Sequence, residues 1–423
     1  MEIKIQSVQF IKPSKSTPQN LRHFKLSLLD QLAPSSYINA IFYYKTNGEV
    51  DISERCDHLV NSLSEALSLY YPLAGRLTED GLEVDCIDQG VKYLVTQVSS
   101  SLDEFLKLDP KNDHISQLIS AKDLDTTLLV TVQVNFFACG ALAIGVTASH
   151  QVTDGCNLIR FINQWASMNR GGGGNINASF EPTFDKLDLL FQPMKVSSCG
   201  HSLVSVDQEA MVVTKRVRFN GTSISKLRAK SGSANGQHTR VTLVASLIWK
   251  ALIAVDQVKC GSLRNCLLAP AMSLRGKASS PVSESSFGNV WAPYPIRFLQ
   301  NETGLEFGDL VDLIEDTTRN VIMWVQKASG EEICRHAHES YALVDEELKQ
   351  NKFCIFTSWC RFPIYEVDFG WGKPCWVTEA GSALEMVTLM DDKDGDGIEA
   401  WVSLNQKEMY VFESDQDILD LTS

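Results

Sequence analysis

The chain has 423 residues, 44% of them hydrophobic, and a formal net charge of −14 at neutral pH. A chain of this length can bury more than one core, so we expect two or three domains. An acidic protein lacks the basic face that phosphate neutralisation requires, which excludes nucleic acid as an expected partner.

The eleven cysteines are scattered and form no Cys-x-x-Cys pair, and a chain of this size needs no disulfides to fold. Reduced thiols in a cytoplasmic protein are therefore the favoured interpretation. The first residues include no continuous apolar signal segment, and no stretch approaches the roughly 18 apolar residues of a membrane span. We accordingly expect no membrane partner and a cytoplasmic location.

The first half of the chain is predicted to combine short strands with two amphipathic helices. Apolar residues recur at helical spacing at residues 52–70 and again at 157–168. The segment around residues 26–30 lies between two prolines and is predicted to be loop-rich. Strands are expected at residues 8–11, 82–86, 92–97, 128–137 and 141–149.

The second half follows a polar, aperiodic stretch at residues 197–207, which we interpret as a crossover between two halves. A β-hairpin is predicted at the end of the chain, from residues 383–390 and 397–404. The remaining pattern predicts strands at 214–219 and 267–272 and helices at 224–230, 240–255, 307–327 and 339–349.

The turn of that hairpin, Asp392-Lys-Asp394-Gly-Asp396-Gly397, imitates the first half of a calcium-binding loop. The twelfth position, where such a loop needs a bidentate glutamate, holds Ser403. A solvated turn is therefore the prediction. Because no cluster of histidines and cysteines has the spacing of metal ligands either, we predict no metal site.

The most informative segment is His150-Gln-Val-Thr-Asp154-Gly155. It follows the uncharged run 141–149, which is predicted to be a buried strand, so the histidine lies where the chain leaves the core. Because imidazole titrates near neutrality, His150 can take a proton from an alcohol or an amine. Asp154 can orient the imidazole or brace its loop. A histidine at a strand end is also a common structural residue, so this hexamer alone does not establish catalysis.

A second motif, Asp368-Phe-Gly-Trp-Gly-Lys-Pro374, describes a tight loop, since its glycines and proline suit neither a helix nor a central strand. Together with His150-x-x-x-Asp154, it resembles the BAHD family of plant coenzyme A-dependent acyltransferases, most of all the vinorine synthase-like acetyltransferase branch. Further landmarks of the family occur in order along essentially the whole chain: Tyr71-Pro-Leu-Ala-Gly-Arg76, Ser273-Leu-Arg275, Phe287-Gly288-Asn289 and Thr357-Ser-Trp359-Cys-Arg361.

The resemblance implies an α/β fold of the chloramphenicol acetyltransferase type, with two domains of mixed sheet and helices and a channel between them. The expected N-terminal domain spans residues 1–191 and carries His150. A crossover loop at residues 192–212 leads to the expected C-terminal domain at 213–423, which carries the Asp368–Pro374 loop.

The same resemblance assigns roles to the site residues. His150 is expected to be the general base that activates the acceptor hydroxyl for attack on a thioester, with Thr357 and Trp359 on the oxyanion side. The family's motif aspartate pairs with an arginine, here Arg275, so Asp154 is expected to brace the catalytic loop. Asp368 is grouped with the catalytic residues by association, although a loop of this type more plausibly shapes the coenzyme A side from a distance. Support of the site is expected from Gly155, Gly370, Trp371 and Gly372.

Acetyl-CoA is the expected co-substrate, and no permanently bound cofactor is expected. The coenzyme's phosphates need cations, although the available basic residues are equally compatible with an ordinary solvated face. The predicted cofactor-binding set comprises Gly288, Asn289, Lys226, Lys230 and Lys373, with Arg228 and Arg240 as further candidates for the phosphates.

The expected acceptor is a hydroxyl of a bulky alkaloid or terpenoid alcohol. Malonyl-using members of the family carry Tyr-Phe-Gly-Asn-Cys where this chain has Ser286-Phe-Gly-Asn-Val290, which argues against a malonyl donor and favours acetyl-CoA. The protein is expected to be a monomer. The alternatives are a hydroxycinnamoyl or benzoyl transferase of the same family, and a non-catalytic binding protein derived from the scaffold.

Overall fold

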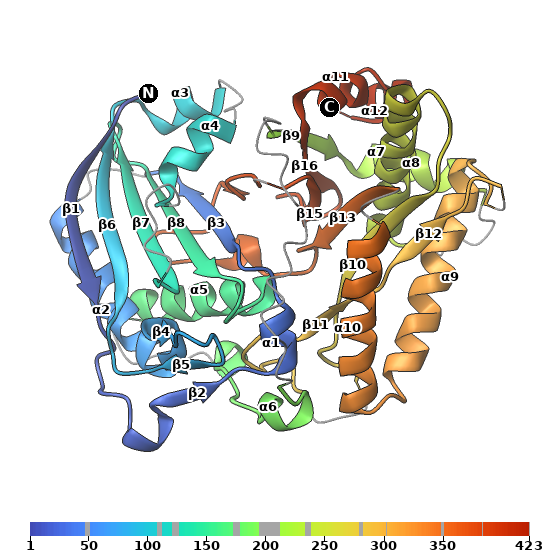
Figure 1. Ribbon diagram of the computed structural model, residues 1–423. Helices are drawn as coiled ribbons and strands as arrows, with labels where there is room; N and C mark the ends of the chain where they lie inside the picture. The colour runs from blue at the N-terminus through green and yellow to red at the C-terminus, as the bar shows by residue number, and fades with distance from the viewer. Residues whose placement is uncertain are drawn as a thin grey trace. The chain divides into compact units, whose positions relative to one another are not determined.

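The chain divides into two compact units, each built of sheet and helices (Figure 1). The first unit comprises residues 1–200, 283–290 and 362–380, and the second comprises residues 201–282, 291–361 and 381–423. The predicted α/β class is confirmed. The computed structural model describes residues 1–46, 51–107, 112–120, 127–171, 178–193, 212–232, 238–278, 282–301, 303–347, 351–382 and 384–422.

The units do not follow a single cut in the sequence. The Asp368–Pro374 loop belongs to the first unit, whereas we expected it in the C-terminal domain. The reason is strand pairing, because β14 (Trp376–Thr378), just after the loop, pairs with β3 (Tyr37–Tyr44) of the first unit. Most of the predicted crossover at residues 192–212 lies outside the described residues, so that boundary stays a prediction.

A six-stranded sheet forms the frame of the first unit, in the order β1-β6-β7-β8-β3-β14. Its strands pair antiparallel except for β6 and β7, which are parallel. The bounds are Ile3–Ile11 for β1, Val91–Val98 for β6, Val130–Phe137 for β7 and Leu142–Ser149 for β8. Every residue of β7 and β8 is buried, which explains why these two strands carry no charged side chain.

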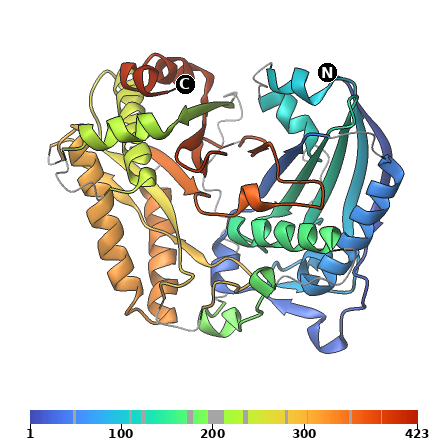
Figure 2. The ribbon, with the colours of Figure 1, turned by 180° about the vertical axis from the view of Figure 1, so that it is seen from behind.

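Two long helices, α2 (Ile52–Leu69) and α5 (Gly155–Arg170), cover one face of this sheet (Figure 2). Each is amphipathic and buries the apolar side that its sequence periodicity predicts. Each also begins after an aspartate, Asp51 or Asp154, whose carboxylate accepts backbone N–H groups of the first turn.

The remaining elements of the first unit are short. A three-stranded sheet has the order β2-β5-β4, with bounds His23–Lys25, Glu83–Asp85 and Arg76–Leu77. The short α-helices are α1 (Leu28–Leu32), α3 (Leu102–Lys107), α4 (Asn112–Ile115) and α6 (Leu187–Leu190). Single 3₁₀ turns occur at Gln19–Leu21, Tyr71–Ala74, Ser116–Leu118, Ala178–Phe180 and Ile364–Glu366.

A seven-stranded sheet forms the frame of the second unit, in the order β11-β10-β13-β15-β16-β9, with β12 also pairing β10. The central strands β10, β13 and β15 are parallel, and the other pairs are antiparallel. The bounds are Val212–Phe219 for β9, Cys266–Ser273 for β10, Trp291–Pro293 for β11, Ile296–Phe298 for β12, Lys352–Ser358 for β13, Met386–Asp391 for β15 and Ile398–Asn405 for β16.

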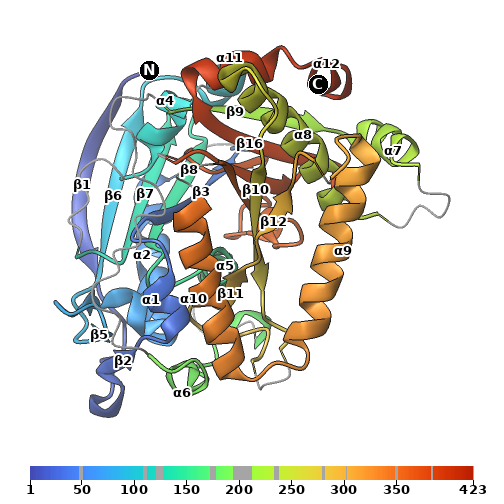
Figure 3. The ribbon, with the colours of Figure 1, turned by 45° about the vertical axis from the view of Figure 1, so that its right-hand side comes forward.

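Six helices accompany this sheet in the described part of the second unit, and Figure 3 shows the three longest, α8, α9 and α10. Their bounds are Gly221–Lys230 for α7, Arg240–Cys260 for α8, Phe307–Val325 for α9, Gly330–Glu347 for α10, Gln406–Glu413 for α11 and Gln416–Leu421 for α12. By length and hydropathy α8 could cross a membrane, contrary to our reading of the sequence, but 67% of its most apolar window is buried. The interior helix of a globular domain passes the same test.

Most of the predicted elements are present, and the closing hairpin is confirmed as β15 and β16. One predicted helix was too short, and one predicted loop contains a helix. The helix predicted at residues 339–349 begins at Gly330, and the loop-rich segment around residues 26–30 contains α1, which Ser27 and Asp30 close with a capping box. The strands β3 and β13 were not predicted from the sequence, although each pairs with a strand on both sides.

Candidate active site

His150 is fixed by its position at the end of β8. This strand lies between β7 and β3, so hydrogen bonds on both sides hold the backbone up to Ser149. The N–H of His150 then donates to the carbonyl of Ser36, at 2.9 Å. The imidazole therefore leaves a rigid strand rather than a free loop, as the sequence predicts.

The side-chain amide of Asn289 is the group that holds the imidazole. Its Oδ1 lies 3.0 Å from Nδ1 of His150. Its Nδ2 donates to the backbone carbonyl of His150, at 2.7 Å, and to Oδ1 of Asp30, at 2.9 Å. Nδ2 of Asn289 thus donates both of its hydrogen atoms, one to each of these oxygen atoms.

This arrangement decides which ring nitrogen carries the proton. An amide oxygen can only accept, so the hydrogen bond at 3.0 Å requires N–H at Nδ1 of His150. The reversed amide would set its oxygen against two acceptors, the Asp30 carboxylate and the His150 carbonyl. In the neutral ring Nε2 is consequently the unprotonated nitrogen, which is the form that a general base needs.

The electrostatic surroundings keep the ring neutral. Burial lowers the pKa of His150 below its ordinary value of 6.5, while a hydrogen bond with its own backbone, the nearby Asp154 carboxylate and the hydrogen bond to Asn289 oppose that shift. Because desolvation is the largest of these effects, the imidazole is unprotonated at neutral pH.

Asp154 has a structural role, as we expected. Its carboxylate is buried and accepts two backbone N–H groups: Oδ1 that of Asn157, at 3.0 Å, and Oδ2 that of Val290, at 3.1 Å. The first bond caps α5, which begins at Gly155, and the second ties the segment 283–290 to the same place. The expected partner Arg275 is buried in the second unit, and its pairing with Asp154 stays a prediction.

The segment at residues 283–290 is held by backbone contacts around Gly288. Asn157 donates from Nδ2 to the carbonyls of Ser286, at 3.1 Å, and Gly288, at 2.8 Å. Gly288 has a φ of 120°, which side chains rarely tolerate, and a Cβ there would lie 3.3 Å from Oδ1 of Asp30. Gly288 and Asn289 were predicted to bind cofactor; the contacts that the structure gives them instead hold the histidine.

The Asp368–Pro374 loop is stabilised from within. Oδ1 of Asp368 accepts the N–H groups of Gly370, at 2.8 Å, and Gly372, at 2.9 Å, while Oδ2 lies 3.6 Å from the guanidinium of Arg170. Both glycines have positive φ, near 105°, which explains their places in the motif. The geometry therefore gives Asp368 a loop-holding role and offers no support for the catalytic one.

Trp371 and Lys373 of the loop contact other residues of the first unit. The ring of Trp371 stacks on that of Phe369, with centroids 5.5 Å apart, and the guanidinium of Arg55 lies over the Trp371 ring, 4.5 Å from its centroid. Lys373 pairs with Glu366, at 2.7 Å, on the surface. These contacts hold Trp371 within the loop, while its predicted support of the site and the predicted contact of Lys373 with the coenzyme both stay predictions.

The predicted oxyanion residues belong to the second unit. Thr357 lies near the end of β13, opposite Thr388 of β15. Trp359 follows directly after the strand, is buried, and donates its backbone N–H to the carbonyl of Leu389, at 2.7 Å. Both are therefore held firmly by the sheet, and their role in the reaction stays a prediction.

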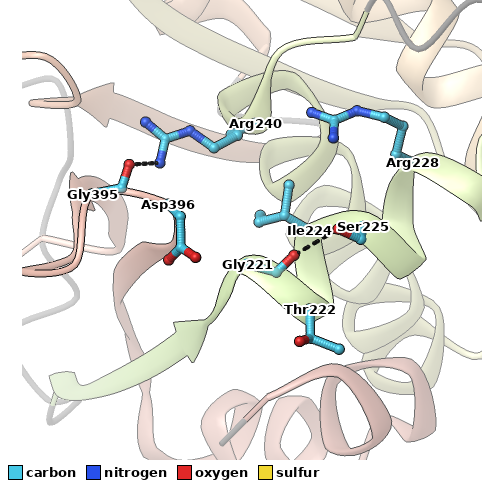
Figure 4. Close-up of a pocket in the computed structure, with 8 residues that line it drawn as sticks. All are labelled: Gly221, Thr222, Ile224, Ser225, Arg228, Arg240, Gly395 and Asp396. Atoms are coloured by element: carbon cyan, nitrogen blue, oxygen red, sulfur yellow. Dashed lines mark hydrogen bonds between the residues drawn. The ribbon is translucent and has the colours of Figure 1, made fainter.

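The basic residues predicted to hold the coenzyme's phosphates differ in their surroundings. Lys226 is exposed on α7, and Lys230 pairs with Asp417. Arg228 and Arg240 line a hollow of about 480 Å³ at the start of α7, with Ile224 between them (Figure 4). Arg240 is already engaged, since it donates to the carbonyl of Gly395, at 2.6 Å, and to Asp391, at 3.0 Å.

The hairpin turn beside this hollow is stabilised by arginine rather than built for calcium. Oδ1 of Asp392 accepts the N–H groups of Gly395 and Gly397, and Oδ2 pairs with Arg218 at 3.2 Å. Asp396 lies against the first turn of α7, within 2.3 Å of where a Cβ of Gly221 would stand. Among the described residues no group of three or more His, Cys, Asp or Glu side chains could hold a metal ion.

Sequence reasoning missed Asp30 and Asn157. The pattern Ser27-Leu-Leu-Asp30 is a capping-box signal that could have located α1. No local pattern could have shown that the same carboxylate reaches Asn289, which lies 259 residues further along the chain.

Comparison with known proteins identifies the class to which this chain belongs. The model of the Transferase family matches residues 1–419, so the chain belongs to this family, that of the BAHD acyltransferases. A limonoid 21-O-acetyltransferase of Melia azedarach is 35% identical over 428 residues, which cover 100% of this chain and 99% of the relative. The predicted enzyme class, an acyl-CoA-dependent O-acyltransferase, is confirmed.

Solved structures confirm the fold. The crystal structure of vinorine synthase matches with a TM-score of 0.82 and 28% identity, covering 100% of this chain and 99% of the other. TRI101 of F. sporotrichioides, crystallised with coenzyme A and T-2, matches with a TM-score of 0.75 and 14% identity, covering 95% of this chain and 99% of the other.

Replacing Asp154 by asparagine is expected to destabilise the protein. One amide oxygen can accept only one of the two N–H groups, of Asn157 and Val290, and the amide nitrogen then faces the other donor. An unsatisfied buried donor costs about 1–3 kcal/mol. Chemical denaturation should show a loss of that size for Asp154→Asn. The matched control is Asp51→Asn, since Asp51 caps α2 through one exposed oxygen and should lose little; equal losses would contradict the account.

The pH dependence of kcat/KM should have an acid limb below pH 6.5. A general base must be unprotonated, so we expect the neutral imidazole to be the active form, and a lowered pKa means that protonation sets in only at lower pH. Activity should therefore be constant around neutrality and fall about tenfold per pH unit below the pKa of His150. Samples held at each pH and assayed at neutral pH control for unfolding. A half-maximal point above pH 6.5 would contradict the burial argument.

Proposed function

We propose that the chain transfers an acetyl group from acetyl-CoA to a hydroxyl of a bulky terpenoid or alkaloid alcohol, with His150 as the general base, and that it acts as a cytoplasmic monomer. The observation that carries the proposal is the hydrogen bond that Nδ1 of His150 donates to the amide oxygen of Asn289, which makes Nε2 the unprotonated nitrogen of a neutral ring. The family to which the chain belongs supports acyl transfer as the reaction.

The chemistry follows from the unprotonated Nε2 of His150. Nε2 of His150 takes the proton of the acceptor hydroxyl while the oxygen attacks the thioester carbon. The imidazolium that forms keeps its Nδ1–H bonded to Asn289, whose amide oxygen stabilises the positive ring. When the tetrahedral intermediate collapses, the C–S bond breaks and the thiolate of coenzyme A takes the proton from Nε2. The histidine returns to its starting form, and no covalent acyl-enzyme is needed.

The tetrahedral intermediate also needs hydrogen-bond donors for its oxyanion. Thr357 carries a hydroxyl and Trp359 an indole N–H, so each can supply one. Removal of a single donor of this kind costs ~3–4 kcal/mol of transition-state stabilisation. Thr357→Val would therefore lower kcat if the hydroxyl is used.

The choice of donor and acceptor rests on relatives and on the segment 283–290. The most similar chain described above acetylates a limonoid, which is a terpenoid, and TRI101 binds coenzyme A together with a second small molecule. Ser286, which replaces the tyrosine of the malonyl motif, donates its hydroxyl to Asp185. This position therefore offers no free group to a malonyl carboxylate, and acetyl-CoA is the donor that we propose.

The proposal is tested by incubating the purified protein with acetyl-CoA, or with benzoyl- or hydroxycinnamoyl-CoA, and a panel of limonoid and alkaloid alcohols. Mass spectrometry should detect a product heavier by one acetyl group. In His150→Ala the rate should fall about 10²–10⁴-fold, because the base is lost, while calorimetry still shows binding of acetyl-CoA. No product with any alcohol would refute transfer, and full activity of His150→Ala would refute the base assignment.

The one-step scheme predicts that acetyl-CoA alone leaves the protein unmodified. Cys156, in the first turn of α5 and two residues after Asp154, is the nearest cysteine in sequence that could relay the acetyl group. Intact-mass measurement after incubation without acceptor should show no adduct. An acetyl adduct that disappears on adding the acceptor and is absent in Cys156→Ser would contradict the direct mechanism.

A further inference from the structure

Asp30 is a fully buried carboxylate whose two oxygens serve different partners. Oδ2 accepts the backbone N–H of Ser27, at 2.9 Å, and its hydroxyl, at 2.7 Å. Oδ1 accepts the backbone N–H of Asn289, at 2.7 Å, and its Nδ2, at 2.9 Å. The first pair of bonds closes the N-terminus of α1, whereas the second reaches the residue that holds His150.

We propose that Asp30 is a positioning residue of the active site, which holds the amide of Asn289 in the one orientation that keeps the proton of His150 on Nδ1. The inference rests on the proposed function, since it concerns the same base. Asp30 does not touch the reacting atoms and acts only through Asn289.

The Asp30 carboxylate is the stronger of the two acceptors that orient the amide of Asn289. The backbone carbonyl of His150 also accepts from Nδ2 of Asn289, but it is a neutral acceptor. A hydrogen bond to an ionised carboxylate is roughly twice as strong as one between neutral groups. Asp30 moreover binds the backbone and the side chain of Asn289 through one oxygen, so it fixes the residue at two points.

A capping role alone does not require the burial of Asp30. The helix α1 has only five residues, and Asp51, which only caps α2, is exposed, whereas the buried capping carboxylate of Asp154 also holds the N–H of Val290. Burial raises the pKa of Asp30 to about 6, although the hydrogen bonds from Ser27 and Asn289 favour its charged form. Folding is therefore penalised by this charge at neutral pH, and a neutral residue would suit stability better.

The backbone at Gly288 packs closely against the Asp30 carboxylate. Gly288 places its Cα so close to Asp30 that a Cβ would stand 3.3 Å from Oδ1 and 3.5 Å from Oδ2. The conformation of Gly288, with φ at 120°, brings the N–H of Asn289 onto that carboxylate. The Phe287-Gly288-Asn289 landmark is thus explained as a backbone turn that delivers an amide between Asp30 and His150.

The test compares Asp30→Asn with Ser27→Ala. Ser27→Ala removes the hydroxyl that donates to Oδ2, but not the backbone N–H, and so weakens the cap of α1 without touching Asn289, which makes it the matched control for a purely structural role. Wild-type transfer of the acetyl group is measured first, since its absence would refute the proposed function and not this inference. For every variant, kcat, KM for acetyl-CoA, the acid limb of kcat/KM and the melting temperature are determined.

Asp30→Asn should lower kcat about tenfold with KM for acetyl-CoA within about twofold, an effect typical of a group that orients another. Its acid limb should move to lower pH, by about half a unit, because loss of a nearby negative charge disfavours the imidazolium. The nearby Asp154 carboxylate, which raises the pKa of the imidazole, is unchanged in this variant. Ser27→Ala should lose stability only, with kcat and the acid limb as in the wild type.

A double-mutant cycle with Asn289→Ala separates action through Asn289 from any other route. In the Asn289→Ala background, Asp30→Asn should cause little further loss of kcat. If Asp30→Asn does not fold, Asp30→Ser, whose hydroxyl accepts without charge, is measured in the same way with the same expectation. Wild-type kcat and acid limb in the folded variant, or full additivity in the cycle, would overturn the proposal and leave Asp30 as a helix cap.

Discussion

The side-chain amide of Asn289 makes three hydrogen bonds at once, and these bonds determine which ring nitrogen of His150 carries the proton. Its two N–H bonds are used on the carbonyl of His150 and the carboxylate of Asp30. Only the oxygen is left for the imidazole, and an oxygen cannot donate. The proton of the ring is therefore assigned to Nδ1 by the neighbours of Asn289, and Nε2 is the nitrogen that we propose as the base.

The surrounding backbone holds the side-chain amide of Asn289 next to His150. The strand β8 delivers His150, the cap of α5 fixes Asp154, and the segment 283–290 returns to meet them. The N–H of Val290 on Asp154 and the N–H of Asn289 on Asp30 hold the segment at two successive residues. Asp154 and Asp30 thus anchor the segment 283–290, and this segment holds the imidazole of His150 in place.

Local pattern predicted the parts of this site that are local. The uncharged run that becomes β8 and the periodic helix α5 were both foreseeable, because burial on two faces or on one stripe leaves a mark in sequence. The strand β3 was not foreseen, since Tyr37–Tyr44 follows a proline-bounded stretch and mixes aromatic residues with asparagine and alanine. The contact of Asp30 with Asn289 joins residues 259 positions apart, and no periodicity encodes such a distance. The motifs indicated the family, but only the fold showed that Asn289 holds the imidazole of His150 and that Asp368 holds its own loop.

The central claim is that the neutral imidazole of His150 carries its proton on Nδ1. Nitrogen NMR of the protein labelled with [¹⁵N]histidine, with His150→Gln used to assign the signals, distinguishes a protonated from a bare ring nitrogen. At pH 7.5 we predict a protonated Nδ1 and a bare Nε2 for His150. A proton on Nε2 at that pH would contradict the account, because the ring would then present a donor where the reaction needs a base.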